Sequence, residues 1–229
     1  MIIDTVKIFL ELKSTIVLKD AKLFLPRMIM NKKQATREHI LQTAFELAST
    51  DGLDSLTIGQ LAKASGMSKS GLFAHFNSKE NLQIAVLEYA GQLFAERVIQ
   101  PARQAVPMGI EKKLRFLLRL WLEWNQSFQG SCMFLDAWKE RGDDDNAVQA
   151  ALTQVTRRWL DYLHRQIERA KAEGEFVSTL DSWQCVYRLY GVYLSSHLFR
   201  SMGLETAEHL RFWQGIDDLF VQWRADRNE

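Results

Sequence analysis

The stretch Thr57–Phe76, TIGQLAKASGMSKSGLFAHF, has the pattern of two short helices joined by a tight turn. Thr57 and Gln60 have the spacing of a capping box, which favours a helix that begins at Thr57. Gly66 suits the left-handed backbone of the turn, and the small Ala62 lets the two helices cross closely. The stretch therefore predicts a helix-turn-helix. A pair of core helices with no binding role is the alternative.

Helix signals continue on both sides of this stretch. Ser68 can cap the second of its two helices. Upstream, we expect a helix that begins at Thr36, as its N-cap, and stops at Gly52. Downstream, Ser78 can cap a longer helix that we expect to end at Pro101.

The C-terminal part of the chain predicts longer helices. Apolar residues recur at three- and four-residue steps, and no alternating strand pattern appears after residue 30, which favours an all-α protein. All seven tryptophans lie in this part, so we expect it to have a different role from the N-terminal helices. Its expected helices lie at about residues 111–128, 148–174, 179–202 and 205–225, with a short segment at 131–140.

The composition is that of an ordinary globular protein. The 229 residues carry a formal net charge of +1, with 47% hydrophobic and 25% charged residues, which excludes collagen-like, disordered and disulfide-scaffold proteins. The charge is uneven, because the residues from Ser55 to Lys79 include Lys63, Lys69 and Lys79 and no carboxylate. This local positive field would attract phosphate despite the near-neutral total.

Cysteine and histidine usage points to the cytoplasm and away from metal chemistry. Cys132 and Cys185 are too few for a disulfide framework. Small core residues are their expected role, with a redox pair, or an electrophile sensor at Cys132, as alternatives. No stretch reaches the ~18 uncharged apolar residues that span a bilayer, so we expect no membrane partner. We expect no metal and no cofactor, since the histidines are widely separated: His39, His75, His164, His197 and His209.

A longer pattern resembles the TetR family of bacterial regulators. It covers residues 35–82 without a gap and includes the family's end motif, G-[LVI]-[YF]-x-H-F-x-x-K-x-x-L. The remaining residues match only in the number of helices. The matching segments are Thr36-Arg37-x-x-Ile40-Leu41-x-x-Ala44, Gly52, Thr57-Ile58, Leu61-Ala62-x-x-Ser65-Gly66 and Gly71-Leu72-Phe73-x-His75-Phe76-x-x-Lys79-Glu80-x-Leu82.

The resemblance implies a homodimeric transcription regulator, usually a repressor, that is not an enzyme. A three-helix domain at residues 33–93, with its helix-turn-helix at about 56–75, would bind a palindromic DNA operator. A larger helical domain at residues 101–229 would bind a small-molecule effector and dimerise. Binding of the effector would change the separation of the two DNA-reading domains and release the operator.

The predicted DNA contacts lie on and beside the second helix of the pair. Thr57 and Ser68 stand at helix N-termini, which suit phosphate oxygens as well as simple capping. Lys69 can donate to guanine, and Ser70 can serve several bases. Gly71 is unfavourable inside a helix, which a close approach to DNA would explain.

Three further DNA contacts come from the resemblance. His75 and Lys79 match family positions that contact the DNA backbone. Phe73 departs from the family, which more often has a tyrosine whose hydroxyl binds phosphate. The phenylalanine keeps the ring and loses that bond, so we expect it only to pack against sugar.

Two sets of residues are predicted in the C-terminal half. A pocket for an apolar or aromatic effector is expected at Trp121, Trp124, Phe128, Phe134, Trp138, Tyr162 and Tyr190, with ordinary core packing as the alternative. The helix at 179–202 is apolar on more than one face, so it must be covered twice. With the final helix it predicts a dimer interface at Val186, Leu189, Gly191, Tyr193, Ser195, Phe212, Ile216, Leu219 and Phe220. A buried central helix in a monomer is the alternative.

Two other functions stay open: a helical enzyme or small-molecule carrier with an incidental helix-turn-helix, and a nucleoid-binding protein that needs no ligand. Two interpretations also stay open for residues 1–30. They are an extension upstream of a misassigned start codon, since Met28 or Met30 offers a natural start, or a basic arm that contacts DNA.

Overall fold

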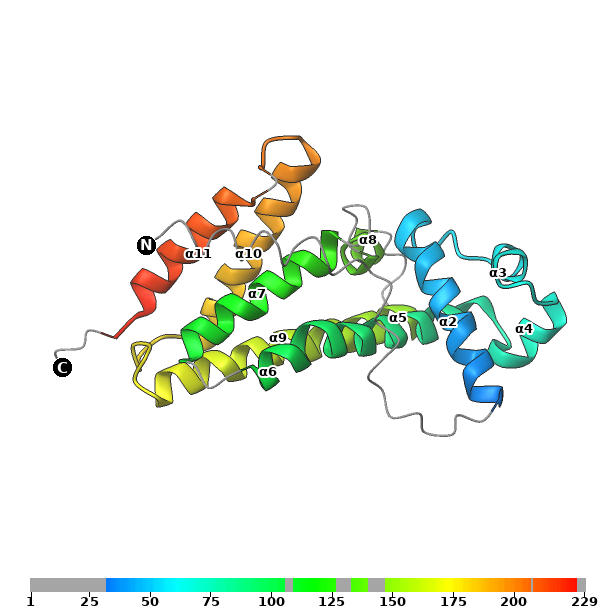
Figure 1. Ribbon diagram of the computed structural model, residues 1–229, viewed down its shortest axis with the longest axis horizontal. Coiled ribbons are helices and arrows are strands. Elements are labelled where there is room, and N and C mark those ends of the chain that lie inside the picture. The colour runs from blue at the N-terminus through cyan, green and yellow to red at the C-terminus, as the bar shows by residue number, and fades with distance from the viewer. Residues whose placement is uncertain (1–31, 106–108, 127–132, 140–146, 207, 226–229) are drawn as a thin grey trace, which may run out of the picture. The chain divides into compact units, whose positions relative to one another are not determined.

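The computed structural model describes residues 32–105, 109–126, 133–139, 147–206 and 208–225, and the predicted N-terminal extension lies outside these ranges. The all-α prediction is confirmed, and the described helices include none that is long and apolar enough to cross a membrane. The elements are α2 (Lys32–Asp51), α3 (Ile58–Ser65), α4 (Lys69–Phe76), α5 (Lys79–Phe94), the π-helical η2 (Ala95–Ile99), α6 (Gln100–Gln104), α7 (Ile110–Gln126), α8 (Met133–Lys139), α9 (Ala147–Ala172), α10 (Ser182–Ser201) and α11 (Leu210–Trp223) (Figure 1).

Helix α2 begins earlier than predicted. Thr36 lies inside the helix, because Lys32 to Ala35 are good helix formers and nothing in their sequence stops the helix. The predicted stop is confirmed: Gly52 has a φ of 88°, and its N–H donates to the carbonyl of Ala48 at 3.1 Å. Residues 1–38 and 39–229 form separate units, and the packing described below belongs to the second.

Pro101 does not end the helical path that begins at Lys79. After α5, the chain widens into η2, where the N–H of Gln100 donates to the carbonyl of Ala95. Pro101 then stands in the first turn of α6, where its missing N–H and fixed φ are tolerated. The path therefore continues to Gln104, and the predicted end at Pro101 is wrong.

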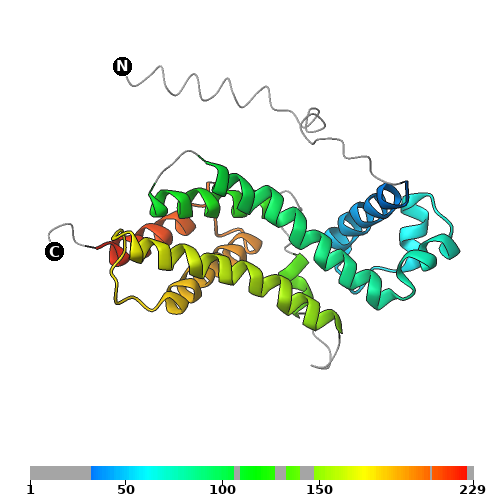
Figure 2. The same cartoon turned by 90° about the horizontal axis from the view of Figure 1, so that it is seen from below.

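Helices α5 and α9 lie side by side along most of their length (Figures 1 and 2). Their close approach depends on Gly91, because a Cβ at this position would lie 2.8 Å from Cγ1 of Val155. Helix α9 also packs against α7, α8 and α10, and α10 packs against α11. Around these contacts lies a core rich in aromatic side chains, among them Trp121, Trp159 and Tyr193.

The N-terminus of α7 is fixed by carboxylates. Glu175 accepts from the N–H groups of Ile110 at 2.7 Å and Glu111 at 2.9 Å, which satisfies donors that have no partner within the helix. The carboxylate of Glu111, in turn, accepts two hydrogen bonds from Arg224, at 2.6 and 2.7 Å, and one from Arg115 at 3.0 Å. These bonds connect the first turn of α7 to the end of α11.

Replacement of Gly91 by alanine tests the contact between α5 and α9. We expect Gly91→Ala to lower the free energy of unfolding by about 1–2 kcal/mol, although alanine favours helices, because overpacking outweighs propensity. In a Val155→Ala background the same change should be neutral or stabilising. Chemical denaturation of the four proteins in this double-mutant cycle measures the coupling. Equal effects in both backgrounds would contradict the predicted clash.

The ion cluster at Glu111 predicts an acid-sensitive contribution to stability. The hydrogen bonds from Arg224 hold the pKa of Glu111 below its ordinary value of 4.5. Its contribution is therefore complete above about pH 4.5 and is lost as the pH falls through the lower, folded-state pKa. We expect Glu111→Gln to reduce stability most near pH 7, and its difference from the wild type to shrink towards pH 3. Urea denaturation at several pH values measures this difference, and one that does not change with pH would count against the cluster.

Candidate functional site

The two short helices of the helix-turn-helix are set by the local signals read from the sequence. The capping box is confirmed: the Thr57 hydroxyl accepts from the N–H of Gln60 at 3.1 Å, and the Gln60 side chain accepts from the N–H of Thr57 at 3.1 Å. Gly66 ends α3 with a φ of 68°. Leu61 and Leu72, one on each helix, are fully buried. The caps and these leucines together fix how α4 is held on α3.

The first turn of α4 presents small polar groups to the solvent. The Ser68 hydroxyl caps the helix by accepting from the N–H of Gly71 at 3.1 Å, and it lies 3.2 Å from the Ser70 hydroxyl. Ser68, Lys69 and Ser70 are exposed. A Cβ on Gly71 would lie 3.1 Å from the Ser68 oxygen. The Ser68 cap therefore leaves little room for a side chain at position 71, and this crowding explains the glycine without DNA. The predicted close approach to DNA is a second explanation.

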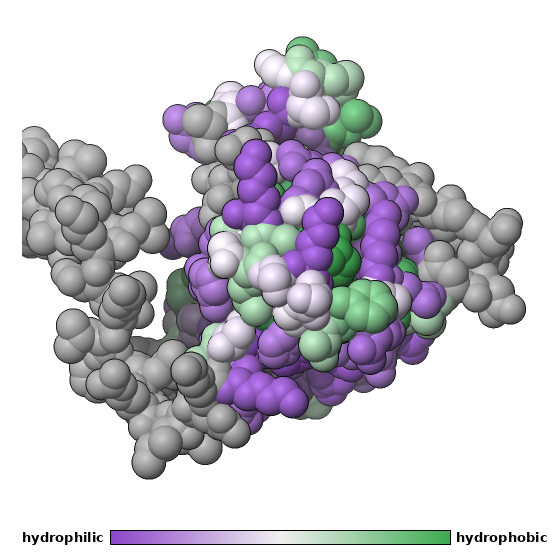
Figure 3. Space-filling view, turned by 90° about the vertical axis from the view of Figure 1, so that its right-hand side faces the viewer, coloured by the Kyte–Doolittle hydropathy of each residue, from purple (hydrophilic) through white to green (hydrophobic). Residues whose placement is uncertain are grey.

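Lys69 lies towards the first turn of α3. A Cβ placed on Gly59 would be 3.8 Å from the Lys69 ammonium nitrogen and 3.9 Å from the Thr57 hydroxyl. These groups and the N-terminal amides of α3 thus share one side of the pair. Figure 3 looks onto the side that α3 and α4 form and shows a mainly hydrophilic surface with scattered hydrophobic side chains.

Lys79 has a structural partner that the sequence did not reveal. Its ammonium group donates to the carbonyl of Asp54 at 2.6 Å, and the Gln83 side chain donates to the carbonyl of Leu53 at 3.0 Å and to the Asp54 carboxylate at 3.1 Å. The first turns of α5 therefore hold the loop that precedes α3. Lys79 itself remains exposed.

The two predicted aromatic contacts of α4 differ in exposure. The side chain of Phe73 is 56% exposed. His75 is half-buried, with its ring centroid 6.2 Å from that of Phe76. Phe73 thus presents its ring to any partner that α4 meets, and His75 presents only part of its side chain.

A cavity of about 200 Å³ lies in the C-terminal half, between α5, η2, α7, α8, α9 and α10. Its polar lining residues include Gln92, Thr156 and Arg158. Half of its lining residues are aromatic: Phe94, Trp121, Trp124, Phe134, Trp159, Tyr190 and Tyr193. Apolar walls with a few polar groups are typical of small-molecule sites.

The predicted pocket residues divide into three groups. Trp121, Trp124, Phe134 and Tyr190 line the cavity. Trp138 and Tyr162 do not, and Phe128 lies outside the described residues.

Three aromatic residues that line the cavity were not predicted to do so. The sequence pattern does not single out Phe94 and Trp159, and it places Tyr193 at the dimer interface instead. Their helical spacing marked them as apolar, but a spacing does not distinguish a wall of a cavity from a filled core.

The structure corrects most of the predicted dimer interface. Gly191 is half-buried and Ser195 is exposed, so both remain available to a partner. The other predicted residues face the core of their own chain because α9, α10 and α11 pack on that side: Val186, Leu189, Tyr193, Phe212, Ile216, Leu219 and Phe220. The opposite face of α10 is also apolar and is exposed, with Tyr187 at 74%, Leu198 at 55% and Leu194 at 41%.

The described residues give little support for redox or metal chemistry. Cys185 is a buried free thiol, and burial raises its pKa to about 11, so it is protonated and unreactive near neutral pH. Cys132 lies outside the described residues. Within the described ranges, no group of three or more histidine, cysteine, aspartate or glutamate residues is placed to hold a metal ion.

Two family models match the chain. The model described as bacterial regulatory proteins of the tetR family matches residues 40–86, which include α3 and α4. The model of a tetracyclin repressor-like C-terminal domain matches residues 110–215, from α7 into α11.

Individual proteins agree with these matches. The chain is 30% identical over 147 residues to the nucleoid occlusion factor SlmA of Marinobacter nauticus, covering 63% of this chain and 71% of that protein. It is 27% identical over 150 residues to the HTH-type transcriptional regulator SrpR of Pseudomonas putida, covering 65% and 67%. A solved TetR transcriptional regulator from Chloroflexus aurantiacus has the same fold, with a TM-score of 0.72 at 22% identity over 86% of this chain and 100% of that one. The chain therefore belongs to the TetR family of bacterial regulatory proteins.

Proposed function

We propose that this protein is a homodimeric transcriptional repressor that binds a palindromic operator and is released by a small-molecule effector. The observation that carries the proposal is the presence, in one chain, of a solvent-facing helix α4 and of an aromatic cavity. A protein that only coats DNA has no need of such a cavity. In the proposed division of labour, residues 33–93 bind DNA, and residues 101–229 bind the effector and dimerise.

The chemistry of the helix-turn-helix supports DNA binding. The residues from Ser55 to Lys79 carry no carboxylate, so nothing in this stretch repels phosphate. Lys69 and Ser70 are exposed in the first turn of α4, the part of a recognition helix that enters the major groove. Thr57 and Ser68 are N-caps, where backbone amides also favour phosphate.

Four further residues, on α4 and α5, are proposed to contact DNA or to let it approach. Phe73 would pack against sugar, and Gly71 would let the DNA approach closely. Lys79 and His75 would contact the DNA backbone. Because Lys79 also holds the carbonyl of Asp54, its loss would disturb the loop before α3 as well as remove a charge.

The exposed face of α10 supports dimerisation. Tyr187, Gly191, Leu194 and Leu198 follow one another at steps of three or four residues, so they form one stripe along the helix. Exposed apolar stripes of this kind mark interaction sites. A two-fold dimer would present two copies of α4 to a palindromic operator.

One alternative function has a specific observation in its favour. A relative at 30% identity is named a nucleoid occlusion factor, which suits a DNA-binding protein without a small-molecule effector. The aromatic cavity favours the ligand-responsive function for this chain. No catalytic step is part of the proposal, since SrpR and the Chloroflexus protein are both named as transcriptional regulators.

A gel-shift assay with the DNA upstream of the protein's own gene tests the proposal. We expect a discrete complex at physiological salt that survives an excess of unrelated DNA. Coating of all DNA equally would favour the nucleoid-binding alternative. Absence of any complex would contradict DNA regulation.

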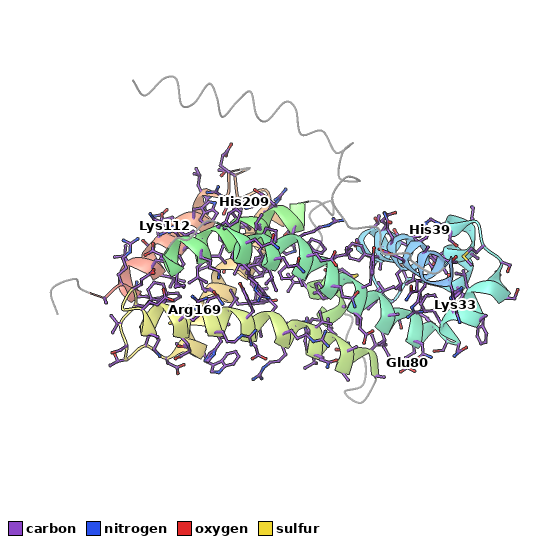
Figure 4. All side chains as sticks on the ribbon, turned by 60° about the horizontal axis from the view of Figure 1, so that its bottom comes forward. Lys33, His39, Glu80, Lys112, Arg169 and His209 are labelled. Atoms are coloured by element: carbon purple, nitrogen blue, oxygen red, sulfur yellow. The ribbon has the colours of Figure 1, made fainter. Side chains whose placement is uncertain are left out.

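Replacement of Lys69 tests base reading by α4. We expect Lys69→Ala to weaken operator binding by about ten- to a hundredfold and to relax the preference at one base pair. Lys112→Ala, at an exposed lysine on α7 (Figure 4), is the matched control and should have no effect. Binding to a panel of operator variants measures both changes. Uniform weakening across all sequences would show that Lys69 contacts phosphate instead.

Substitution of charged residues into the exposed apolar stripe of α10 tests dimerisation. We expect the wild type to have twice the mass of one chain at micromolar concentration, and Leu194→Glu with Leu198→Glu to have the mass of one chain, because burying two carboxylates opposes association. Phe73→Glu, at an apolar residue exposed on α4, should remain a dimer. Light scattering after size exclusion measures the mass. A wild-type monomer, or a dimer unaffected by the two glutamates, would contradict this interface.

A further inference from the structure

The polar residues of the cavity are biased towards positive charge. Among the described residues that line it there is no aspartate or glutamate, and the one charged lining residue is Arg158. Arg158 is largely exposed while it lines the cavity, so it stands at the rim. No ion pair or hydrogen bond joins it to any other described residue.

The neighbouring arginine is different. Arg157 is paired with Asp161 at 2.9 Å, and its guanidinium lies 5.0 Å from the ring centroid of Trp183. It does not line the cavity. Of these two adjacent arginines on α9, Arg157 is therefore paired within the protein, and Arg158 is available to a ligand at the rim of the cavity.

Two polar atoms of residues that line the cavity are fully buried and have no hydrogen-bond partner. They are Nε1 of Trp159, whose side chain is 7% exposed, and the hydroxyl of Thr156. An indole N–H can only donate, so it requires an acceptor. A buried donor without an acceptor is unfavourable. Both residues line the cavity beside Arg158, but neither of these atoms opens into it, so the Arg158 guanidinium is the donor that a ligand can reach at this place.

Several basic side chains lie near Tyr162, which packs against Trp159. Tyr162, whose ring stacks on Trp159 at a centroid distance of 6.3 Å, has a buried hydroxyl without a partner. Burial raises the pKa of this hydroxyl, against the opposing charges of Arg103, Arg169 and Arg165. Burial, together with the charges of Arg169 and Arg103, lowers the pKa of Lys113 against the opposing charge of Glu173. Figure 4 shows Arg169 on α9.

The size of the cavity limits the ligand. About 200 Å³ exceeds the ~150 Å³ of an apolar cavity that binds benzene and is below the ~300 Å³ at which drug-sized sites begin. Aromatic walls match a planar ring by stacking and edge contacts. Such walls also attract cations, but Arg158 at the rim and the absence of a lining carboxylate oppose a cationic ligand.

We infer that the effector is an aromatic carboxylate of one or two rings, with its ring among Trp121, Trp124 and Trp159 and its carboxylate accepting hydrogen bonds from Arg158. The inference rests on the proposed function, because it names the chemical class of the ligand for the same cavity.

Three probes of the same shape and different charge test the inference: 2-naphthoate, the neutral 2-naphthamide and 2-naphthylmethylammonium. Calorimetric titration of the full-length protein near pH 7.5 should show that the carboxylate binds at least about tenfold more tightly than the amide, as expected for charge-assisted hydrogen bonds. The ammonium compound should bind most weakly.

Two variants assign the preference to named groups. Arg158→Gln should reduce the affinity for 2-naphthoate to nearly that for the amide and leave amide binding unchanged. Trp159→Phe keeps a ring in the wall and leaves Arg158 in place, so it should change the affinities for the carboxylate and the amide by similar factors. Arg157→Gln, at the adjacent arginine outside the cavity, is the control and should change neither affinity.

Several outcomes would overturn the inference. They are equal or tighter binding of the amide or the ammonium compound, equal effects of Arg158→Gln and Arg157→Gln, and failure of all three probes to bind. The proposed function is tested separately, because specific operator binding in the gel shift does not depend on the probes. A protein that binds its operator and none of the probes would keep the regulatory function and lose this ligand class.

Discussion

The close contact of α5 with α9 is the constraint on which the rest of the structure depends. It requires a glycine at position 91, because a Cβ there would meet Val155 at 2.8 Å. The same two helices supply much of the wall of the cavity, with Gly91 and Val155 both among the lining residues. A bulkier residue at 91 would separate the helices and change the cavity together with the stability.

Helix α5 also connects the helix-turn-helix to the cavity. At its N-terminus, Lys79 and Gln83 hold the carbonyls of Asp54 and Leu53, in the loop that leads to α3. At its other end, Gln92 and Phe94 line the cavity. Under the proposed function, a ligand in the cavity would contact the same helix that holds the loop before the DNA-reading pair. A ligand changes DNA binding only if its affinity differs between the conformation that binds DNA and the one that does not. Contact with α5 would allow such a difference.

The prediction from sequence was most accurate where the signals are local. The Thr57–Gln60 capping box, the left-handed Gly66 and the Ser68 and Ser78 caps each depend on residues within one turn of helix. Two local predictions were wrong. The helix expected at Thr36 begins at Lys32, and Pro101 lies within the helical path, in the first turn of α6, where its missing N–H is tolerated. A cap residue or a proline is compatible with a helix boundary but does not require one.

The sequence by itself therefore determined the all-α class, the helix-turn-helix and the aromatic character of the C-terminal half, because caps, glycines and apolar spacing act over a few residues. Only the tertiary structure decided how the apolar residues are divided. Helix α10 is apolar on two faces, and the packing of α9 and α11 buries Val186 and Leu189 and leaves Tyr187 and Leu198 in solvent. Likewise, Trp159 lines the cavity while Tyr162, three residues later, does not. Burial is a property of the neighbouring helices, and their positions are fixed by contacts between residues distant in the sequence.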